Sequence, residues 1–296
     1  MIRKYIGTLT LLGLITMVNF GCIAELDVNE YTDQLGKQDN LQVNEQEYTE
    51  AERVINQEKD VEITDREKSK PYRYNENDGI FLFYKTEDEE LYRKLLPKEF
   101  DMPDEMIVHL FIVDFYDLDS DADPYKEMSI SLLAKHNDEN IWHCIYMPVT
   151  SEQSMMAGIL GLGLPKTIGN IEFERAEFIF TGTIVDDQNR SGEISLDTKG
   201  DDLSVAEVEI VRNFMSYPKI NILKGEFIEM TRAGGAVNII DVAERYSEFV
   251  TIKGGAATIT FESSTDTKAH PFDLVPSEIV AAYYMHNKIP FSLDRK

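Results

Sequence analysis

One lysine of this sequence stands in unusually apolar surroundings. The stretch from Gly158 to Gly169 holds four glycines, one proline and several large aliphatic residues, and Lys166 is its single ionisable residue. Transfer of an amine from water into an apolar environment disfavours the charged ammonium form. The neutral amine is a nucleophile that can form a Schiff base with a carbonyl carbon. The composition of this stretch is therefore compatible with a lysine that reacts with carbonyl compounds, but it does not by itself predict one.

Lys166 also has an ordinary interpretation, because lysines commonly lay their carbon chain along apolar surface and keep the charged end in water. The two interpretations differ in where the amine points. The reactive one requires the amine to face a dry chamber with aliphatic walls. An amine in bulk solvent, or one paired with a carboxylate that holds its proton, would argue against carbonyl chemistry.

Several short motifs occur in the order that is typical of one protein family. They are Phe83–Thr86, Leu91–Pro97, Tyr125-Lys126-Glu127, the run Met156–Lys166 that ends in Leu-Pro-Lys, Tyr217-Pro218, Ile222–Lys224 and Pro276–Ile279. Together they resemble the acetoacetate decarboxylase family, from about Tyr74 to the C-terminus. The chain resembles a divergent member, and the resemblance implies a β-rich, cone-like fold in which Lys166 lines an interior cavity. It also implies a homo-oligomer.

The resemblance carries residue roles onto this chain. It assigns the imine to Lys166, the lysine that follows the proline, and it matches the acidic residue of a Tyr-x-Glu motif to Glu127 as the second catalytic residue. It places Tyr125, Gly158 and Leu164 at the substrate.

Much of the charged shell that the family implies is replaced. Thr167 stands where a second lysine is expected, and Ile159-Leu160 stands where the family has Arg-Glu. An arginine that would meet a substrate carboxylate falls near Asn77, with Arg73, four residues earlier, as a substitute. The residue expected to form the imine is thus retained, while most of its charged neighbours are not.

The net charge narrows the choice of partners. The chain has 54 acidic and 29 basic residues and a formal net charge of −25. Such a surface repels phosphate backbones, so we expect no nucleic-acid partner. We also expect contact with a membrane only through an N-terminal lipid.

The N-terminus predicts an export signal. Arg3 and Lys4 precede an uncharged, mostly apolar segment, residues 6–20, and Cys22 follows. The segment is shorter than the roughly 20 apolar residues that a spanning helix needs. We predict a signal peptide over 1–21 and acylation of Cys22, which gives an extracytoplasmic lipoprotein anchored to a membrane. Plain cleavage nearby and an uncleaved anchor are the alternatives.

Two further segments follow from composition. Residues 22–72 are polar and strongly charged, which is typical of a disordered acidic tether. A partner-binding arm is the alternative. Residues 73–296 carry the hydrophobic patterns and the motifs of the family, so they form the predicted domain.

The domain shows many strand patterns and few helices. Strands are expected near 80–84, 106–116, 126–135, 140–147, 171–184, 192–198 and 204–211. Thr150 or Ser151 caps a helix that the glycines end near residue 160, and Gly254-Gly255 predicts a hairpin turn. The pattern favours a mainly β (α+β) fold: an antiparallel, closed or partly closed barrel with a few short helices.

Other groups that could do chemistry have simpler interpretations. Cys144 lies in an apolar strand pattern and is expected to be a small buried hydrophobe. The acidic series at 117, 119, 121 and 123, with Glu127, resembles a calcium loop but lacks its glycine and its final glutamate at the required positions. It is a solvated loop or a loose calcium site. The five histidines show no zinc spacing, and we predict no metal and no cofactor.

Three functions are consistent with these residues. The first is an enzyme in which Lys166 forms an imine with a small oxo-acid, leading to decarboxylation or a related lyase or aldolase step with Glu127 moving protons. The second is a tethered binding protein that holds an apolar or carbonyl-bearing ligand in the same cavity without turnover. The third is an inert relative with a structural role in the envelope.

Overall fold

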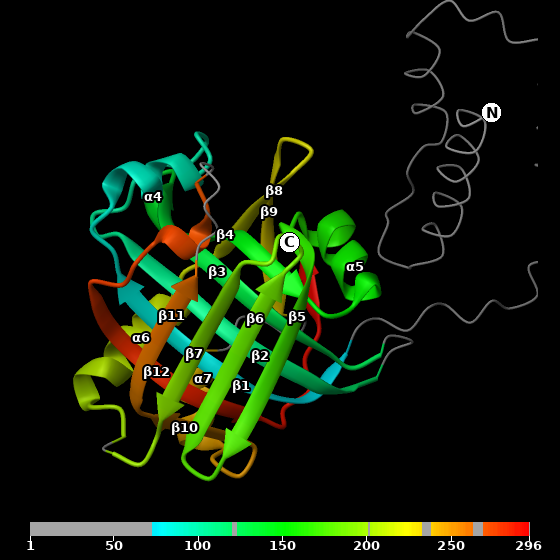
Figure 1. Ribbon diagram of the computed structural model, residues 1–296, viewed down its shortest axis with the longest axis vertical. Helices are drawn as coiled ribbons and strands as arrows, with labels where there is room; N and C mark the ends of the chain where they lie inside the picture. Colours follow the sequence, from blue (N-terminus) through cyan, green and yellow to red (C-terminus); the bar gives the residue numbers. More distant parts are fainter. Residues whose placement is uncertain (1–72, 120–122, 201, 233–237, 263–268, 296) are drawn as a thin grey trace, which may run out of the picture. The chain divides into compact units, whose positions relative to one another are not determined.

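The computed structural model describes residues 73–119, 123–200, 202–232, 238–262 and 269–295 (Figure 1). The predicted signal peptide 1–21, the lipidation site Cys22 and the tether to residue 72 lie outside these ranges. None of the helices within the ranges is long and apolar enough to cross a membrane.

Strands make up most of the described chain. They are β1 (Tyr74–Lys85), β2 (Ile107–Leu118), β3 (Tyr125–His136), β4 (Glu139–Val149), β5 (Lys166–Ala176), β6 (Ile179–Asp186), β7 (Ser191–Asp197), β8 (Lys219–Leu223), β9 (Glu226–Arg232), β10 (Val250–Gly254), β11 (Ala256–Glu262), β12 (Glu278–Asn287) and β13 (Leu293–Arg295). The helices are α4 (Glu89–Leu95), α5 (Glu152–Leu162), α6 (Val205–Ser216), α7 (Ile239–Arg245) and the short 3-10 helix η1 (Pro271–Asp273).

All described strands belong to one large mixed sheet. Its main path runs β10-β12-β1-β2-β3-β4-β5-β6-β7-β11, with β8, β9 and β13 attached beside it. Most neighbours are antiparallel, but β4 pairs in parallel with both β5 and β8. The path starts at β10 and ends at β11, and no pairing between described strands joins these ends. The expected mainly β fold is therefore present. The expected closed or partly closed, antiparallel barrel is not confirmed, because the described sheet is mixed and its path is not closed.

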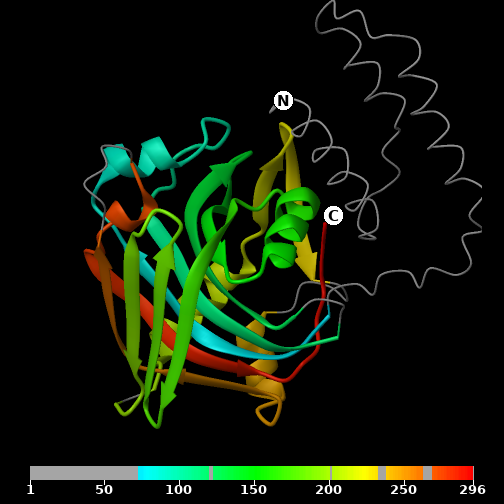
Figure 2. The ribbon, with the colours of Figure 1, turned by 45° about the vertical axis from the view of Figure 1, so that its right-hand side comes forward.

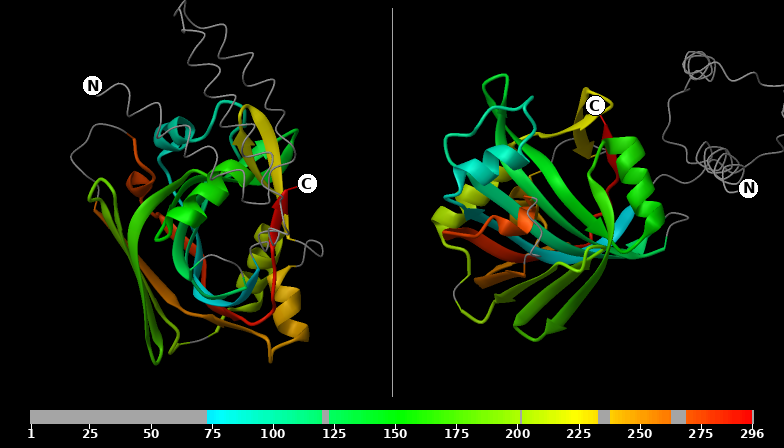
Figure 3. Two further views of the ribbon diagram at one scale, coloured as in Figure 1. Left: turned by 90° about the vertical axis from the view of Figure 1, so that its right-hand side faces the viewer. Right: turned by 45° about the horizontal axis from the view of Figure 1, so that its top comes forward.

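Two cores lie on opposite faces of the long strands. On one face, β5, β6, β7 and β11 stack against β1–β3 (Figures 1 and 2), where Ile80, Leu110 and Ile130 pack with Ile184 and Ile194. On the other face, β1, β2 and β3 curve around a second core (Figure 3), to which α5, α6 and α7 contribute residues. Strands that are buried on both faces appear in a sequence as nearly continuous apolar runs. This explains why many strands of this protein can be predicted from its sequence.

The glycine pair at the end of β10 does not form the expected hairpin. β10 pairs with β12, whereas β11 pairs with β7. Side chains are excluded at both glycines: a Cβ on Gly254 would lie 2.4 Å from the backbone N of Leu203, and one on Gly255 would lie 2.4 Å from the carbonyl O of Asp197. The pair therefore lets one nearly continuous strand pass from one part of the sheet to the other.

Residues 204–211, expected to be a strand, begin helix α6. The Ser204 side chain accepts from the backbone N–H of Glu207, and the Glu207 carboxylate accepts from the N–H of Ser204. This reciprocal capping box fixes the first turn. Val208 and Val211 pack on the second core from the same helix, at the three-residue spacing that brings side chains to one helical face.

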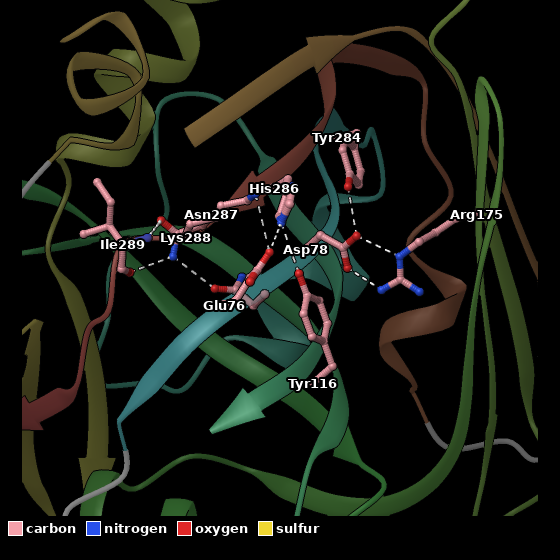
Figure 4. A network of polar contacts seen from close by, with 10 residues as sticks. Glu76, Asp78, Tyr116, Arg175, Tyr284, His286, Asn287, Lys288 and Ile289 are labelled. Atoms are coloured by element: carbon pink, nitrogen blue, oxygen red, sulfur yellow. Dashed lines mark hydrogen bonds and ion pairs between the residues drawn. The ribbon is translucent and has the colours of Figure 1, made fainter. Parts of the chain in front are cut away.

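A polar network connects β5 with β1, β2 and β12 (Figure 4). Asp78 of β1 and Asp114 of β2 lie opposite each other, and both carboxylates accept hydrogen bonds from the guanidinium of Arg175 in β5. The Tyr284 hydroxyl of β12 donates to Asp78 over 2.8 Å. Two carboxylates with little exposure are thus paired with one cation from the opposite layer. We interpret this network as a structural clamp.

Candidate active site

Lys166 is placed by the end of α5. The Ser151 side chain caps this helix by accepting a hydrogen bond from the backbone N–H of Ser154. Gly163 ends it with a φ of 63°, in the left-handed region where glycine meets no steric penalty. Lys166 follows as the first residue of β5, opposite Met147 of β4. The predicted cap and the glycine stop are confirmed, although the helix runs on to Leu162.

The amine of Lys166 is buried among polar groups. Its Nζ lies 2.7 Å from Oε2 of Glu127 and 3.3 Å from Oγ of Ser154. It also lies 5.5 Å from the centre of the Tyr125 ring. The Lys166 and Glu127 side chains are 5% and 9% exposed. Burial is what the reactive interpretation requires. The carboxylate at 2.7 Å, however, is the kind of partner that counts against carbonyl chemistry unless it takes the proton from the amine. The predicted aliphatic walls are wrong, because a carboxylate and a hydroxyl contact the amine directly.

The aliphatic residues that suggested a dry chamber do not share one environment. Leu160 is 40% exposed on α5, and Leu164 is buried in the second core. Side chains at successive helical positions leave the axis in different directions, so a run of apolar residues does not all line one site. The faces turned toward Lys166 are those that carry Ser154 and Gly158 on α5, and Tyr125 and Glu127 on β3.

Gly158 leaves the space that the lysine side chain occupies. A Cβ at this position would lie 2.5 Å from Cε, 2.6 Å from Cδ and 3.2 Å from Nζ of Lys166. The first two separations are far inside ordinary carbon contacts of about 3.5–4.0 Å. Gly158 therefore acts by seating the lysine, whichever ligand the site takes.

Tyr125 contributes a buried aromatic side chain close to the amine. Its side chain is 3% exposed, and its hydroxyl lies 3.0 Å from the hydroxyl of Tyr74 in β1. Burial raises the pKa of Tyr125 well above its ordinary value, the neighbouring Tyr74 and Glu127 act in the same direction, and a hydrogen bond with Ser154 opposes them. The phenol therefore keeps its proton at neutral pH.

The family model described as acetoacetate decarboxylase (ADC) matches residues 61–295. The chain belongs to the acetoacetate decarboxylase family. Comparison with curated protein sequences gives no match.

Solved structures of acetoacetate decarboxylases share the fold at low sequence identity. One acetoacetate decarboxylase is 16% identical with a TM-score of 0.57, covering 76% of this chain and 87% of its own. The acetoacetate decarboxylase from Legionella pneumophila is 14% identical with a TM-score of 0.57, covering 80% and 92%. The enduracididine biosynthesis enzyme MppR, solved in complex with pyruvate, is 14% identical with a TM-score of 0.54, covering 79% and 91%.

The residues matched to the acetoacetate decarboxylase family fall into two groups. Lys166, Glu127, Tyr125 and Gly158 come together as described above. Asn77 lies apart from them in its contacts: it is 2% exposed, and its Oδ1 accepts a hydrogen bond from Asn287 over 3.1 Å.

Arg73 does not join the lysine cluster among the described contacts. Its side chain is exposed, and its backbone O accepts a hydrogen bond from the N–H of Asp119 over 2.8 Å. The suggested substitution of Arg73 for the family's arginine stays a prediction.

Sequence reasoning missed Ser154 and Tyr74. Ser154 occurs three residues after the cap of α5, where a serine has no distinctive pattern of its own. A signal was present, because Ser154 precedes Gly158 by four positions and so shares its helical face. Tyr74 could not be found in this way, since its contact with Tyr125 depends on strand pairing.

The remaining groups have structural surroundings. Cys144 is buried, and burial raises the pKa of its thiol to about 11, which fits the expected small hydrophobe. Asp121 of the acidic series lies outside the described residues, and Glu127 faces Lys166. Within the described ranges, no group of three or more His, Cys, Asp and Glu side chains could hold a metal ion.

Proposed function

We propose that this protein forms an imine between Lys166 and the carbonyl group of a small oxo-acid, followed by decarboxylation or a related lyase or aldolase step. The observation that carries the proposal is the buried pair of Lys166 and Glu127, with Nζ and Oε2 2.7 Å apart. A nucleophile within hydrogen-bond reach of a base is the arrangement that covalent catalysis by lysine requires. The pyruvate bound to MppR, a structural neighbour, makes an oxo-acid the first class to test.

Glu127 has a defined task in this proposal. A carboxylate beside a buried lysine favours the ammonium form, so the free amine must arise by transfer of a proton from Nζ to Oε2 of Glu127. The amine then adds to the carbonyl carbon, and loss of water gives a protonated imine. Glu127 returns its proton to the departing oxygen, so the dehydration needs no external acid.

The imine acts as the electron sink for the next step. When a carboxylate on the carbon next to the imine carbon leaves as CO₂, as in acetoacetate, or when a proton is removed from that carbon, as in pyruvate, the electron pair moves toward nitrogen and gives an enamine. Protonation at carbon and addition of water then release the product and free Lys166. This chemistry requires no metal and no organic cofactor.

Proton exchange in heavy water tests the proposal even if no CO₂ is lost. With pyruvate, enamine formation replaces the methyl protons by deuterium, which proton NMR follows directly. With acetoacetate, the same spectra report acetone. Lys166→Arg should abolish both signals, because arginine stays protonated and cannot form the imine. Lys126→Arg, at the position next to Glu127 in β3, is the matched control and should behave as wild type. Equal exchange in both variants would refute the proposal.

Ligand binding without turnover is the second candidate. It is favoured by the contacts of the amine, which Glu127 and Ser154 already satisfy, and by the replacement of charged family residues at Ile159, Leu160 and Thr167. A thermal-shift screen of oxo-acids and neutral carbonyl compounds against wild type and Lys166→Ala separates the candidates. Stabilisation that survives the substitution supports binding, since the variant has no amine.

For the N-terminus, we propose cleavage after residue 21 and acylation of Cys22, so that the domain is anchored outside the cytoplasm. The supporting feature is the order of positive charge, apolar segment and cysteine. Mass spectrometry of the mature N-terminus from cells should find a lipid on Cys22, and Cys22→Ser should release the protein from the membrane fraction. An unmodified N-terminus in a soluble fraction would contradict this.

A further inference from the structure

The buried hydroxyl groups of Ser154, Tyr125 and Tyr74 form a series that begins next to the amine of Lys166. Ser154 is 2% exposed, and its Oγ lies 3.3 Å from Nζ. Ser154 opposes the rise in the pKa of Tyr125 as a side-chain hydrogen-bond partner, and the Tyr125 hydroxyl lies 3.0 Å from that of Tyr74. Nζ is thus contacted by a carboxylate from β3 and by a hydroxyl from α5.

We propose that Ser154 is a catalytic residue of imine formation, which donates a hydrogen bond to the substrate oxygen as Lys166 adds to the carbonyl carbon, and that Tyr125 and Tyr74 position its hydroxyl. The assignment rests on the proposed function of Lys166. It adds a residue that no sequence motif indicates. It also explains why a hydroxyl group lies next to the amine.

The location of Ser154 matches what the reaction needs. When the amine attacks the carbonyl carbon, negative charge develops on the carbonyl oxygen. This oxygen is bonded to the carbon that Nζ attacks. A group 3.3 Å from Nζ can therefore reach that oxygen as well. Glu127 is suited to take a proton from nitrogen but, as an anion, it cannot stabilise a second negative charge. The Ser154 hydroxyl is neutral and can donate, which makes it the complementary group.

The protons and bonds balance along this path. Glu127 first removes one proton from the ammonium group, and the N–C bond forms as the carbonyl π electrons move to oxygen. Ser154 Oγ–H gives its proton to that oxygen and takes one from the positively charged nitrogen, which leaves a neutral carbinolamine. The C–O bond then breaks, the proton held by Glu127 joins the hydroxyl as water, and the imine carries the positive charge. Ser154 and Glu127 both end in their starting states.

The fold separates this task from helix capping. Ser151 is the N-cap of α5, so the Ser154 side chain is not needed for capping, although both serines lie at the start of the helix. Tyr125 stays protonated because burial raises its pKa. A neutral phenol that contacts both Ser154 and Tyr74 can hold the serine hydroxyl in one orientation, whereas an ionised one would compete for its proton.

Exchange of the ketone oxygen with ¹⁸O-labelled water measures this step, because each cycle of carbinolamine formation and dehydration replaces the oxygen. At saturating pyruvate, Ser154→Ala should lower the exchange rate about 100-fold, the range typical of one lost donor or acid, while the midpoint of thermal unfolding changes little. Tyr125→Phe should lower the rate by a smaller factor. Ser151→Ala, the control, should lower the unfolding midpoint and leave the rate constant unchanged.

The outcomes separate this assignment from the proposed function. Wild-type exchange that Ser154→Ala leaves intact overturns the role of Ser154 and leaves the imine standing. Wild-type protein that exchanges no oxygen above the uncatalysed rate overturns both. An equal loss of rate in Ser151→Ala and Ser154→Ala would show a purely structural effect of the helix and would also overturn the assignment.

Discussion

Replacement of Gly158 by alanine tests how the lysine is seated. The new Cβ would lie 2.5 Å from Cε and 2.6 Å from Cδ of Lys166. Restoring an ordinary contact requires the side chain to move by about 1 Å. Because the hydrogen bond to Glu127 spans 2.7 Å, a shift of that size directed away from the carboxylate breaks it. Gly158→Ala should therefore act on stability and on reactivity together.

Two opposing energies set the size of the effect. Alanine in place of glycine within a helix stabilises it by about 1 kcal/mol, while overpacking of a filled interior costs about 1–3 kcal/mol. Gly161 lies in the same helix and has no atom within 4 Å of an added Cβ. Gly161→Ala therefore gains the helical term without the overlap. The difference in unfolding free energy between the two variants isolates the overlap, and we expect about 1–3 kcal/mol.

Urea denaturation gives this difference, and borohydride reduction in the presence of pyruvate gives the yield of imine in the same samples. Gly161→Ala should unfold at slightly higher urea than wild type and trap the same amount of pyruvate. Gly158→Ala should unfold at lower urea than Gly161→Ala and trap much less. Two variants with equal unfolding free energies and equal yields would refute the seating argument.

Three further predictions follow from charges and contacts. Glu127→Gln should lower methyl-proton exchange of pyruvate at least 100-fold and destabilise the fold by about 3–5 kcal/mol, since a buried ammonium loses its counter-charge; NMR and urea denaturation measure the two effects. Arg175→Met should destabilise by about 2–4 kcal/mol because two nearly buried carboxylates lose their cation, and adding Asp78→Asn should restore part of the urea midpoint. The pKa of His270 is lowered to about 4 by burial and by Arg190, with Asp186 and Asp273 opposing. The unfolded chain therefore binds this proton more readily than the folded protein does. As the pH is lowered from about 6.5 to 4, the free energy of unfolding should fall by at most about 3 kcal/mol. His270→Asn keeps an acceptor for the N–H of Phe272 and should flatten this slope in unfolding curves recorded across that range.

The sequence predicts local features of this site well because their causes are local. The cap at Ser151, the stop at Gly163 and the lysine on the exit of α5 depend on residues within a few positions of one another. The capping box of Ser204 is equally local, yet the valines that follow it suggested a strand. β-Branched residues favour strands when their spacing is ignored. Three-residue spacing of the valines was the stronger signal.

Partners that meet through folding could not be predicted from local pattern. Glu127 reaches Lys166 from a strand 39 positions earlier, and only the family resemblance paired them. Gly254-Gly255 has the composition of a hairpin, but the choice of β12 and β7 as partners depends on the whole sheet. The aliphatic run before Lys166 indicated burial correctly, whereas its composition could not reveal that Ser154, rather than Leu160, faces the amine.

The most direct measurement is the location of the trapped carbonyl compound. Wild-type protein is incubated with pyruvate or acetoacetate, reduced with borohydride, digested and mapped by mass spectrometry. We predict that the reduced adduct forms on Lys166, and that Lys166→Arg carries none. Absence of an adduct, or an adduct spread over exposed lysines in both proteins, would contradict the assignment of Lys166 as the imine-forming residue.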